Sequence, residues 1–171
     1  MNSFTPTALR PLQMRPRLLR RTSPDWTVTN SDVFDLEPGQ GDVPYLDPPY
    51  TKRQYAAYYH IPETIAAEDE PKVSGITGLR PWKAKSSAFC YKVKAAKTMD
   101  SLLGALESHR ILISYSSEGH IPPHEIASMT QRHGKTTTHR FENFGRYAPN
   151  AESQAKSAGR GLTEFVFDIR R

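Results

Sequence analysis

The sequence has little cysteine and no long apolar run, and each shortage excludes a class of protein. The single Cys90 rules out an internal disulfide and a zinc site built from several cysteines of this chain. It fits a reducing cytoplasm, and we expect it to be a small buried apolar residue rather than a nucleophile. No apolar run approaches the roughly 18 residues of a membrane span, and no apolar stretch of a secretory signal follows the basic N-terminus. The sequence therefore predicts a cytoplasmic protein without a membrane partner.

Histidines are few and irregularly spaced, which argues against a metal site. His120 and His124 are four residues apart, a spacing that can place two ligands on one helix face. Pro122 and Pro123 lie between them and interrupt such a helix. We therefore expect no bound metal.

Two segments contain no acidic residue, although the whole chain contains 18. Residues 1–24 carry five arginines, and residues 72–97 carry seven lysines and arginines. Trp82 and Tyr91 lie in the second segment, and basic residues with interleaved aromatics are typical of a surface that contacts nucleic-acid phosphates. The alternative is a solvated loop whose charge only aids solubility. The nucleic-acid contacts that we predict are Arg53, Arg80, Lys83, Lys85, Lys92 and Lys94.

The length of 171 residues allows one domain with a buried core. Its mean hydropathy of −0.63 is polar for a self-sufficient α/β domain. Residues 1–24 are rich in Arg, Pro and Thr, and we expect them to be disordered. The folded domain is then 25–171, with a charged loop at 68–85 that could serve as a lid.

Hydrophobic periodicity predicts alternating strands and helices. Strands are expected at 42–47, 111–115, 135–141 and 163–169. Helices are expected at 52–60, at 99–106 and from Pro122 onward. Thr98 or Asp100 would cap the second helix, and Pro62 argues against an uninterrupted first helix that reaches Ala67. This order predicts an α/β fold of parallel strands that ends in a hairpin.

The most informative segment is Tyr45-Leu46-Asp47-Pro48-Pro49-Tyr50. Two prolines end the short strand in a rigid turn, and they hold the preceding Asp47 extended. The turn presents a carboxylate, a carbonyl and an aromatic face at the end of a sheet. These groups suit a planar base with an exocyclic amine. Asp47 and the Pro48 carbonyl can accept the two amine hydrogens, and Tyr50 can stack on the base.

Asp47-Pro48-Pro49-Tyr50 resembles the catalytic motif of amino-group methyltransferases that use S-adenosylmethionine. The segments that follow narrow the resemblance to adenine-specific DNA methyltransferases of the DNA adenine methylase type. Similar segments occur in order and at plausible spacing: Thr51–Tyr55, Tyr58–His60, Glu63–Ile65, Ser87–Cys90, Ile111–Gly119 and Leu162–Phe167. The resemblance spans most of residues 30–170.

The resemblance implies a fold and a reaction. The fold is the C-terminal half of a Rossmann-like methyltransferase, a mixed sheet whose last strand is antiparallel. The reaction is methyl transfer from S-adenosylmethionine to the 6-amino group of adenine in DNA, as in restriction-modification systems. The catalytic motif would be Asp47, Pro48, Pro49 and Tyr50.

The resemblance also implies contacts to the cofactor. Asp32 and Phe34 lie where the family tends to contact the cofactor adenine, and Asp47 would contact the cofactor as well. The alternative for Asp32 and Phe34 is a turn followed by a packed phenylalanine. Ser114–Ser116 end a strand, where they would either line the pocket or simply cap the strand.

One feature of the family is missing. Such enzymes carry a Phe-x-Gly-x-Gly loop for the cofactor, usually before the catalytic motif, and the 46 residues before Asp47 do not contain it. Pro38–Gly41 is expected to be an ordinary turn. We therefore expect a split or truncated form, whose partners are DNA and an N-terminal methyltransferase subunit that carries the loop. Two alternatives stay open. One is an inactive remnant or a subunit that only binds nucleic acid, and the other is an RNA methyltransferase.

Overall fold

A computed structural model of the chain describes residues 27–144 and 161–171. Asp32–Arg171 forms one compact unit, and the fold below is that of this unit. The segment 1–24, for which the sequence predicts disorder, lies outside the described residues. The domain boundary at residue 25 therefore stays a prediction.

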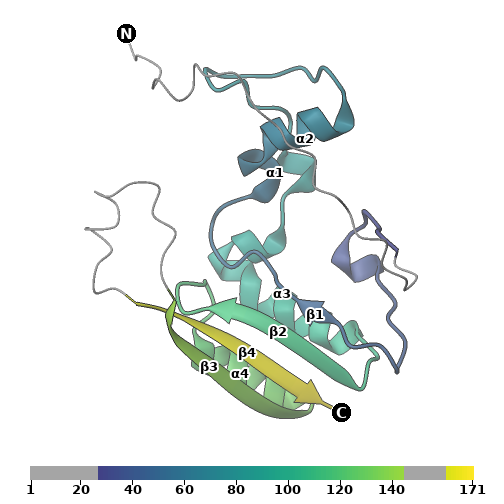
Figure 1. The fold of residues 1–171 in the computed structure, drawn as a ribbon, viewed down its shortest axis with the longest axis vertical. Helices are drawn as coiled ribbons and strands as arrows, with labels where there is room; N and C mark the ends of the chain where they lie inside the picture. The colour runs from purple at the N-terminus through teal and green to yellow at the C-terminus, as the bar shows by residue number, and fades with distance from the viewer. Residues whose placement is uncertain (1–26, 145–160) are drawn as a thin grey trace, which may run out of the picture. The chain divides into compact units, whose positions relative to one another are not determined.

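Four strands form one mixed sheet in the order β1-β2-β4-β3 (Figure 1). They are β1 (Tyr45–Leu46), β2 (Arg110–Ser116), β3 (Lys135–Phe144) and β4 (Leu162–Arg170). β1 runs parallel to β2, whereas β4 is antiparallel to both of its neighbours. This confirms the predicted mixed sheet with a terminal antiparallel hairpin. The last strand of the hairpin lies inside the sheet, between β2 and β3.

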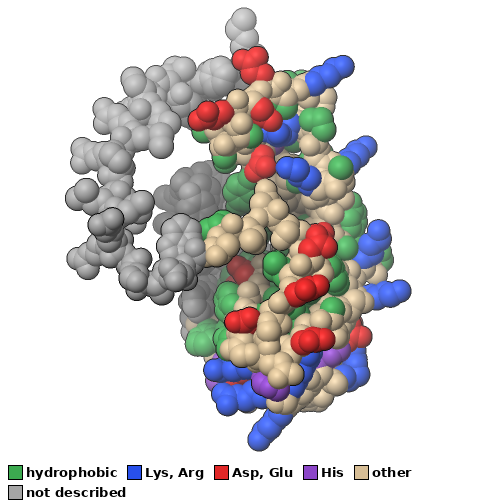
Figure 2. All heavy atoms as spheres, turned by 90° about the vertical axis from the view of Figure 1, so that its right-hand side faces the viewer, with side chains coloured by type: hydrophobic (Ala, Val, Ile, Leu, Met, Phe, Trp, Pro, Cys, Tyr) green, Lys and Arg blue, Asp and Glu red, His purple; other side chains and the backbone are tan. Residues whose placement is uncertain are grey.

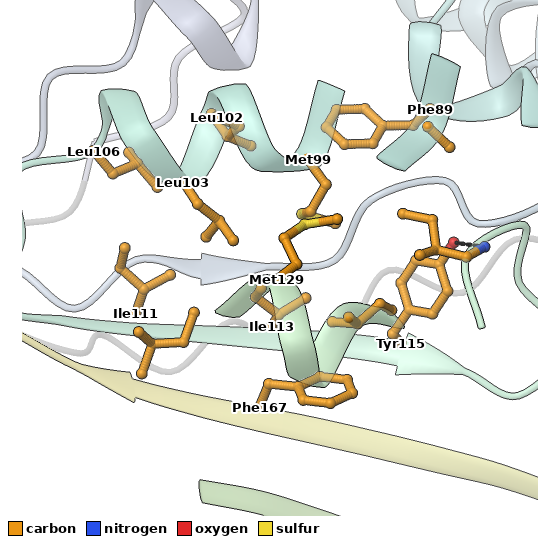
Figure 3. Packing of buried hydrophobic residues seen from close by; sticks show 14 residues of the cluster. Phe89, Met99, Leu102, Leu103, Leu106, Ile111, Ile113, Tyr115, Met129 and Phe167 are labelled. Atoms are coloured by element: carbon orange, nitrogen blue, oxygen red, sulfur yellow. Dashed lines mark hydrogen bonds between the residues drawn. The ribbon is translucent and has the colours of Figure 1, made fainter. Parts of the chain in front are cut away.

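Two helices, α3 (Lys92–Ala105) and α4 (Pro123–His133), cover the same face of the sheet (Figure 1). Alternate residues of β2 and β4 point to these helices, because side chains along a strand alternate between its faces. Figure 3 shows the apolar layer that results. Its fully buried members include Met99, Leu103, Ile111, Ile113, Ile126, Phe167 and Ile169, each at 0% exposure. Leu102 and Leu106, in the segment predicted to be helical at 99–106, are buried as well.

β1 is shorter than the predicted strand 42–47, because it begins at Tyr45. The preceding residues form a turn instead. The Asp42 N–H donates to the Gly39 carbonyl at 3.1 Å, and the Asp42 carboxylate accepts from the Gly39 N–H at 2.8 Å. Pro44 has no N–H to donate to a neighbouring strand. The two-glycine segment before β1 is thus the ordinary turn that the sequence predicts.

α3 begins earlier than predicted, with Tyr91 as its N-cap residue. Thr98 and Asp100 lie inside the helix, so the prediction that either caps it is wrong. The Thr98 hydroxyl donates instead to the Lys94 carbonyl at 2.9 Å. Ala95, at 1% exposure, extends the buried stripe by one turn. Its side chain is too small to stand out in a pattern of larger apolar residues.

The helix predicted over 52–60 is two short helices, α1 (Tyr55–Tyr58) and α2 (His60–Ala67), which are separated at Tyr59. Pro62 does not interrupt α2, because it lies in the first turn, where an N–H has no intrahelical partner. No uninterrupted helix reaches Ala67, as predicted, but the break lies at Tyr59 and not at Pro62.

A long loop joins α2 to α3, as predicted. It contains one isolated bridge between Ser74 and Leu79, followed by the 3-10 helices η3 (Lys83–Lys85) and η4 (Ala88–Cys90). A further 3-10 helix, η2 (Val33–Asp35), precedes β1. Among the described residues, no helix has the length and apolar character that a membrane crossing requires. Within the same ranges, no three His, Cys, Asp or Glu residues are grouped so that they could hold a metal ion.

Candidate active site at one edge of the sheet

The ends of three strands meet at one edge of the sheet. β1 and β2 are parallel, so Asp47 after β1 and Ser116 at the end of β2 lie at the same edge. β4 runs the other way, and its residue Glu164 pairs with Ser116 in the sheet register. The Ser117 N–H donates to the Thr163 carbonyl at 2.9 Å and ties β2 to β4 there. Active sites of open α/β sheets gather at this kind of edge.

The Asp-Pro-Pro-Tyr motif forms the centre of this edge. Asp47 is exposed, whereas Pro48, Pro49 and Tyr50 are half-buried. The carbonyl of Tyr50 accepts a hydrogen bond from the His120 N–H at 2.8 Å. The motif is therefore anchored through the backbone of its last residue, and its carboxylate is accessible.

The ring of Tyr50 rests against the buried ring of Tyr115, with the ring centroids 5.8 Å apart and an interplanar angle of 60°. Tyr115 is itself fixed, because its hydroxyl accepts from the Ile121 N–H at 3.2 Å (dashed line in Figure 3). A side chain at Gly119 would overlap the Tyr115 ring. Tyr115 is one of the residues predicted to line the pocket or cap the strand. It is only 2% exposed, and its ring instead packs against the Tyr50 ring of the motif.

Two carboxylates of this site, those of Asp47 and Glu164, lie close enough that the charge of the first raises the pKa of the second. Burial raises the pKa of Glu164, and the negative charge of Asp47 raises it further, while a hydrogen bond with Ser116 lowers it. Burial also raises the pKa of the Tyr50 hydroxyl, followed by the charges of Glu164 and, more weakly, Asp47. Sequence reasoning missed Glu164, because only the pairing of β4 with β2 brings it to this edge.

The segment after the motif is clamped to the start of η4. The buried Gln54 side chain donates to the Ser87 carbonyl at 3.1 Å and accepts from the Ser87 N–H at 2.8 Å. The Cys90 thiol donates to the Arg53 carbonyl at 3.2 Å. Cys90 is 3% exposed, as predicted for a small buried residue, and burial raises the pKa of its thiol. These contacts fix the backbone that carries Arg53.

Two of the six predicted nucleic-acid contacts are paired with acids. Arg80 forms a two-pronged ion pair with Asp69, at 3.0 and 2.8 Å, and also donates to Thr64 at 2.9 Å. Lys85 pairs with Glu63 at 3.3 Å. On the face shown in Figure 2, some Lys and Arg side chains project along the right-hand margin and others gather at the bottom of the view. The exposed members of the predicted set are Arg53, Lys83, Lys85, Lys92 and Lys94.

The predicted cofactor contacts Asp32 and Phe34 form a small local motif. The Asp32 carboxylate accepts from the Phe34 N–H at 3.0 Å and caps η2. The Phe34 ring is 46% exposed, so the alternative of a packed phenylalanine is wrong. Val33, between them, packs against the core instead.

Comparison with known proteins identifies relatives that are longer than this chain. Type II methyltransferase M.FokI of Planomicrobium okeanokoites is 37% identical over 83% of this chain and 22% of that protein. Type II methyltransferase M.NlaIII of Neisseria lactamica is 32% identical over 79% of this chain and 40% of that protein. Type II methyltransferase M.CviAII of Paramecium bursaria Chlorella virus 1 is 29% identical over 99% of this chain and 49% of that protein. The chain thus spans less than half the length of each of these relatives. No solved structure matches it.

The family described as D12 class N6 adenine-specific DNA methyltransferase matches residues 1–129, well over half of the chain. The match includes the motif at the end of β1 and the buried strand that supports it. The chain therefore belongs to the D12 class N6 adenine-specific DNA methyltransferase family.

Proposed function

We propose that this chain provides the target-base site of a DNA methyltransferase that transfers a methyl group from S-adenosylmethionine to the 6-amino group of adenine. The observation that carries the proposal is the exposed Asp47 carboxylate beside the Tyr50 ring, which rests on Tyr115. Family membership supports the same reaction. Because the chain spans only 22% of M.FokI and 40% of M.NlaIII, the proposal covers the part of the reaction that these residues perform.

Asp47 and Pro48 act on the amine of the target. The lone pair of an adenine amine is delocalised into the ring, which makes the nitrogen a weak nucleophile. Hydrogen bonds from its two hydrogens to the Asp47 carboxylate and the Pro48 carbonyl favour a pyramidal nitrogen. They also stabilise the positive charge that develops as the nitrogen–methyl bond forms, so they strengthen in the transition state. Asp47 thus contributes as a fixed negative charge.

Tyr50 holds the base. An adenine within a duplex must leave the base stack before its amine can reach Asp47. The Tyr50 ring can stack on the extruded base, and its edge contact with Tyr115 keeps it from turning away. Its raised pKa keeps the hydroxyl neutral at physiological pH, so the ring face, not a charge, makes the contact.

Asp32, Phe34 and Asp47 would contact S-adenosylmethionine. The half-exposed ring of Phe34 can cover an adenine face, and the exposed carboxylates of Asp32 and Asp47 suit hydroxyl and ammonium donors. These residue types fit the two ends of the cofactor. When bound, the cofactor supplies an electrophilic methyl group.

Methylation of adenine-containing duplex DNA with labelled S-adenosylmethionine tests the proposal, with the full chain alone or joined by an N-terminal subunit that carries the cofactor loop. Incorporated label is followed, and N6-methyladenine is identified in the hydrolysed product. Asp47→Ala should lower the rate on the order of 100-fold or more, as for loss of one preorganised electrostatic group. Tyr50→Ala should weaken capture of the base by about 1–3 kcal/mol, and Tyr50→Phe should be mild because it keeps the ring.

The matched control is Glu107→Ala, an exposed acid just before β2, at the opposite edge of the sheet. It should leave the rate unchanged. Near-normal activity of Asp47→Ala would contradict the proposal. So would methylation of an adenine-containing RNA, offered in a parallel assay, when the DNA is not methylated.

A further inference from the structure

Beside the motif lies a hollow of about 320 Å³ that is lined mainly by tyrosines and cations. We call it the tyrosine pocket and define it by Tyr50, Tyr55, Tyr58, Tyr59, Lys52 and Arg53. Its volume falls in the roughly 300–1,000 Å³ range of sites that bind small molecules. A group the size of a nucleotide therefore fits.

Three tyrosines of the pocket, two in α1 and one directly after it, are exposed, and their rings hold one another in place. Tyr55, Tyr58 and Tyr59 are 50%, 60% and 54% exposed. The Tyr55 and Tyr59 rings meet at 82° with centroids 5.5 Å apart, and the Tyr58 and Tyr59 rings meet at 70° and 5.9 Å. In such edge-to-face pairs, one ring offers only its edge, so a ring face stays accessible. Fixed ring faces of this kind are where proteins stack the bases of single strands.

The two cations of the pocket complement a phosphate. The guanidinium carbon of Arg53 lies 5.1 Å from the centroid of the Tyr58 ring. A guanidinium held in this way can stack on a base or donate paired hydrogen bonds to a phosphate. The backbone of Arg53 is held by Cys90 and by the Gln54 clamp. Lys52 adds a second positive charge, against one acid among the lining residues, Glu118.

The tyrosine pocket continues the site of the motif. Tyr50 belongs to both. Burial, followed by the charge of Asp47, raises the pKa of the Tyr55 hydroxyl, so the first tyrosine of α1 lies within electrostatic reach of the motif carboxylate. A strand that delivers its target base to Asp47 therefore carries its neighbouring nucleotide toward this pocket.

We propose that the tyrosine pocket binds a second nucleotide of the DNA strand, adjacent to the target adenine. The base stacks on Tyr55 and on the face of Tyr58 that Arg53 does not cover, and Arg53 and Lys52 contact the phosphate. This inference rests on the proposed function only in assigning the strand to the substrate of Asp47. Stacking does not depend on base identity, so the pocket adds affinity without reading sequence.

The test compares two fluorescein-labelled single strands of twelve units by anisotropy, at low salt and without cofactor. One is all thymidine, and the other has the same phosphates with abasic sugars. The full chain should bind the thymidine strand more tightly. Tyr58→Leu should lose about fivefold or more of that affinity, the lower end of the stacking range, and keep its affinity for the abasic strand. Arg53→Gln should weaken both.

Two variants keep the result interpretable. Tyr58→Phe retains the ring and should bind as the wild type does. Tyr45→Leu removes a ring of the same 60% exposure that does not line the pocket, and it should have no effect. Circular dichroism of each variant checks the fold. Equal affinity of the full chain for the two strands, no binding of either, or a Tyr58→Leu variant that binds like the wild type would overturn the inference.

Neither strand contains adenine, so the outcome is independent of methyl transfer. The expected binding pattern together with near-normal methylation by Asp47→Ala would refute the proposed function and leave the pocket standing. Methylation together with equal binding of the two strands would do the reverse. Tighter binding of an all-uridine RNA strand than of thymidine would overturn the assignment to DNA.

Discussion

At the residue scale, the site depends on side chains that face one another across different strands. The Tyr50 ring is held by Tyr115, whose own position requires the absence of a side chain at Gly119. The negative charge of Asp47 contributes to the raised pKa of the partly buried Glu164. The site therefore holds an accessible carboxylate that can bind a target and a second carboxylate whose ionisation is disfavoured.

This difference predicts a pH-dependent effect of Glu164→Gln. The folded-state pKa of Glu164 is raised, mainly by burial. The ionised form therefore destabilises the fold once the pH exceeds the folded-state pKa, and the effect vanishes below the unfolded value of about 4.3. Glu164→Gln should raise the melting temperature relative to the wild type at pH 7.5 and bring no such gain at pH 4. Glu107→Gln, an exposed acid, is the control. A gain that is equal at both pH values would contradict the assignment.

At the element scale, the sequence predicts best what is local. The stripe of Met99, Leu102 and Leu103 and the run Ile111–Tyr115 fall where the pattern puts them, because spacing along the chain alone decides which face they share. The position of Glu164 could not be predicted, because it depends on the pairing of β2 with β4, and these two strands are far apart in the sequence. The motif was predictable because all its groups lie in six consecutive residues.

The junction between α4 and β3 yields a prediction that only the packing reveals. A Cβ at Gly134 would lie 2.5 Å from the backbone oxygen of Arg170. That oxygen belongs to β4, which pairs there with Lys135 of β3, so it cannot move away without disturbing the sheet. Gly134→Ala should destabilise the fold by about 1–3 kcal/mol, the usual cost of overpacking. Thermal unfolding measures it. The control is Gly41→Ala, whose Cβ would meet nothing within 4 Å; similar melting temperatures for the two variants would refute the argument.

At the scale of the whole molecule, the net charge of +5 does not act as one uniform field. Two of the seven cations in the acid-free segment 72–97, Arg80 and Lys85, form ion pairs with acids that lie earlier in the chain. Arg80 is bound by Asp69, and its side chain is 15% exposed. Lys92 is exposed at the start of α3. A count of basic residues in the sequence therefore overstates how many can contact phosphate.

We accordingly predict different effects for two substitutions that remove one positive charge each. The full chain should bind DNA nonspecifically, with an affinity that falls as salt rises, because phosphate contacts release counterions. Lys92→Gln should reduce the slope of log affinity against log salt by about one.

Arg80→Gln should leave that slope nearly unchanged, because Asp69 already neutralises the guanidinium. It should instead speed proteolysis of the loop between α2 and η3, which the Arg80 contacts to Thr64 and Asp69 hold in place. Anisotropy titrations at several salt concentrations and limited digestion separate the two effects, and an Arg80→Gln slope reduced as much as that of Lys92→Gln would mean that Arg80 leaves Asp69 to contact the phosphate.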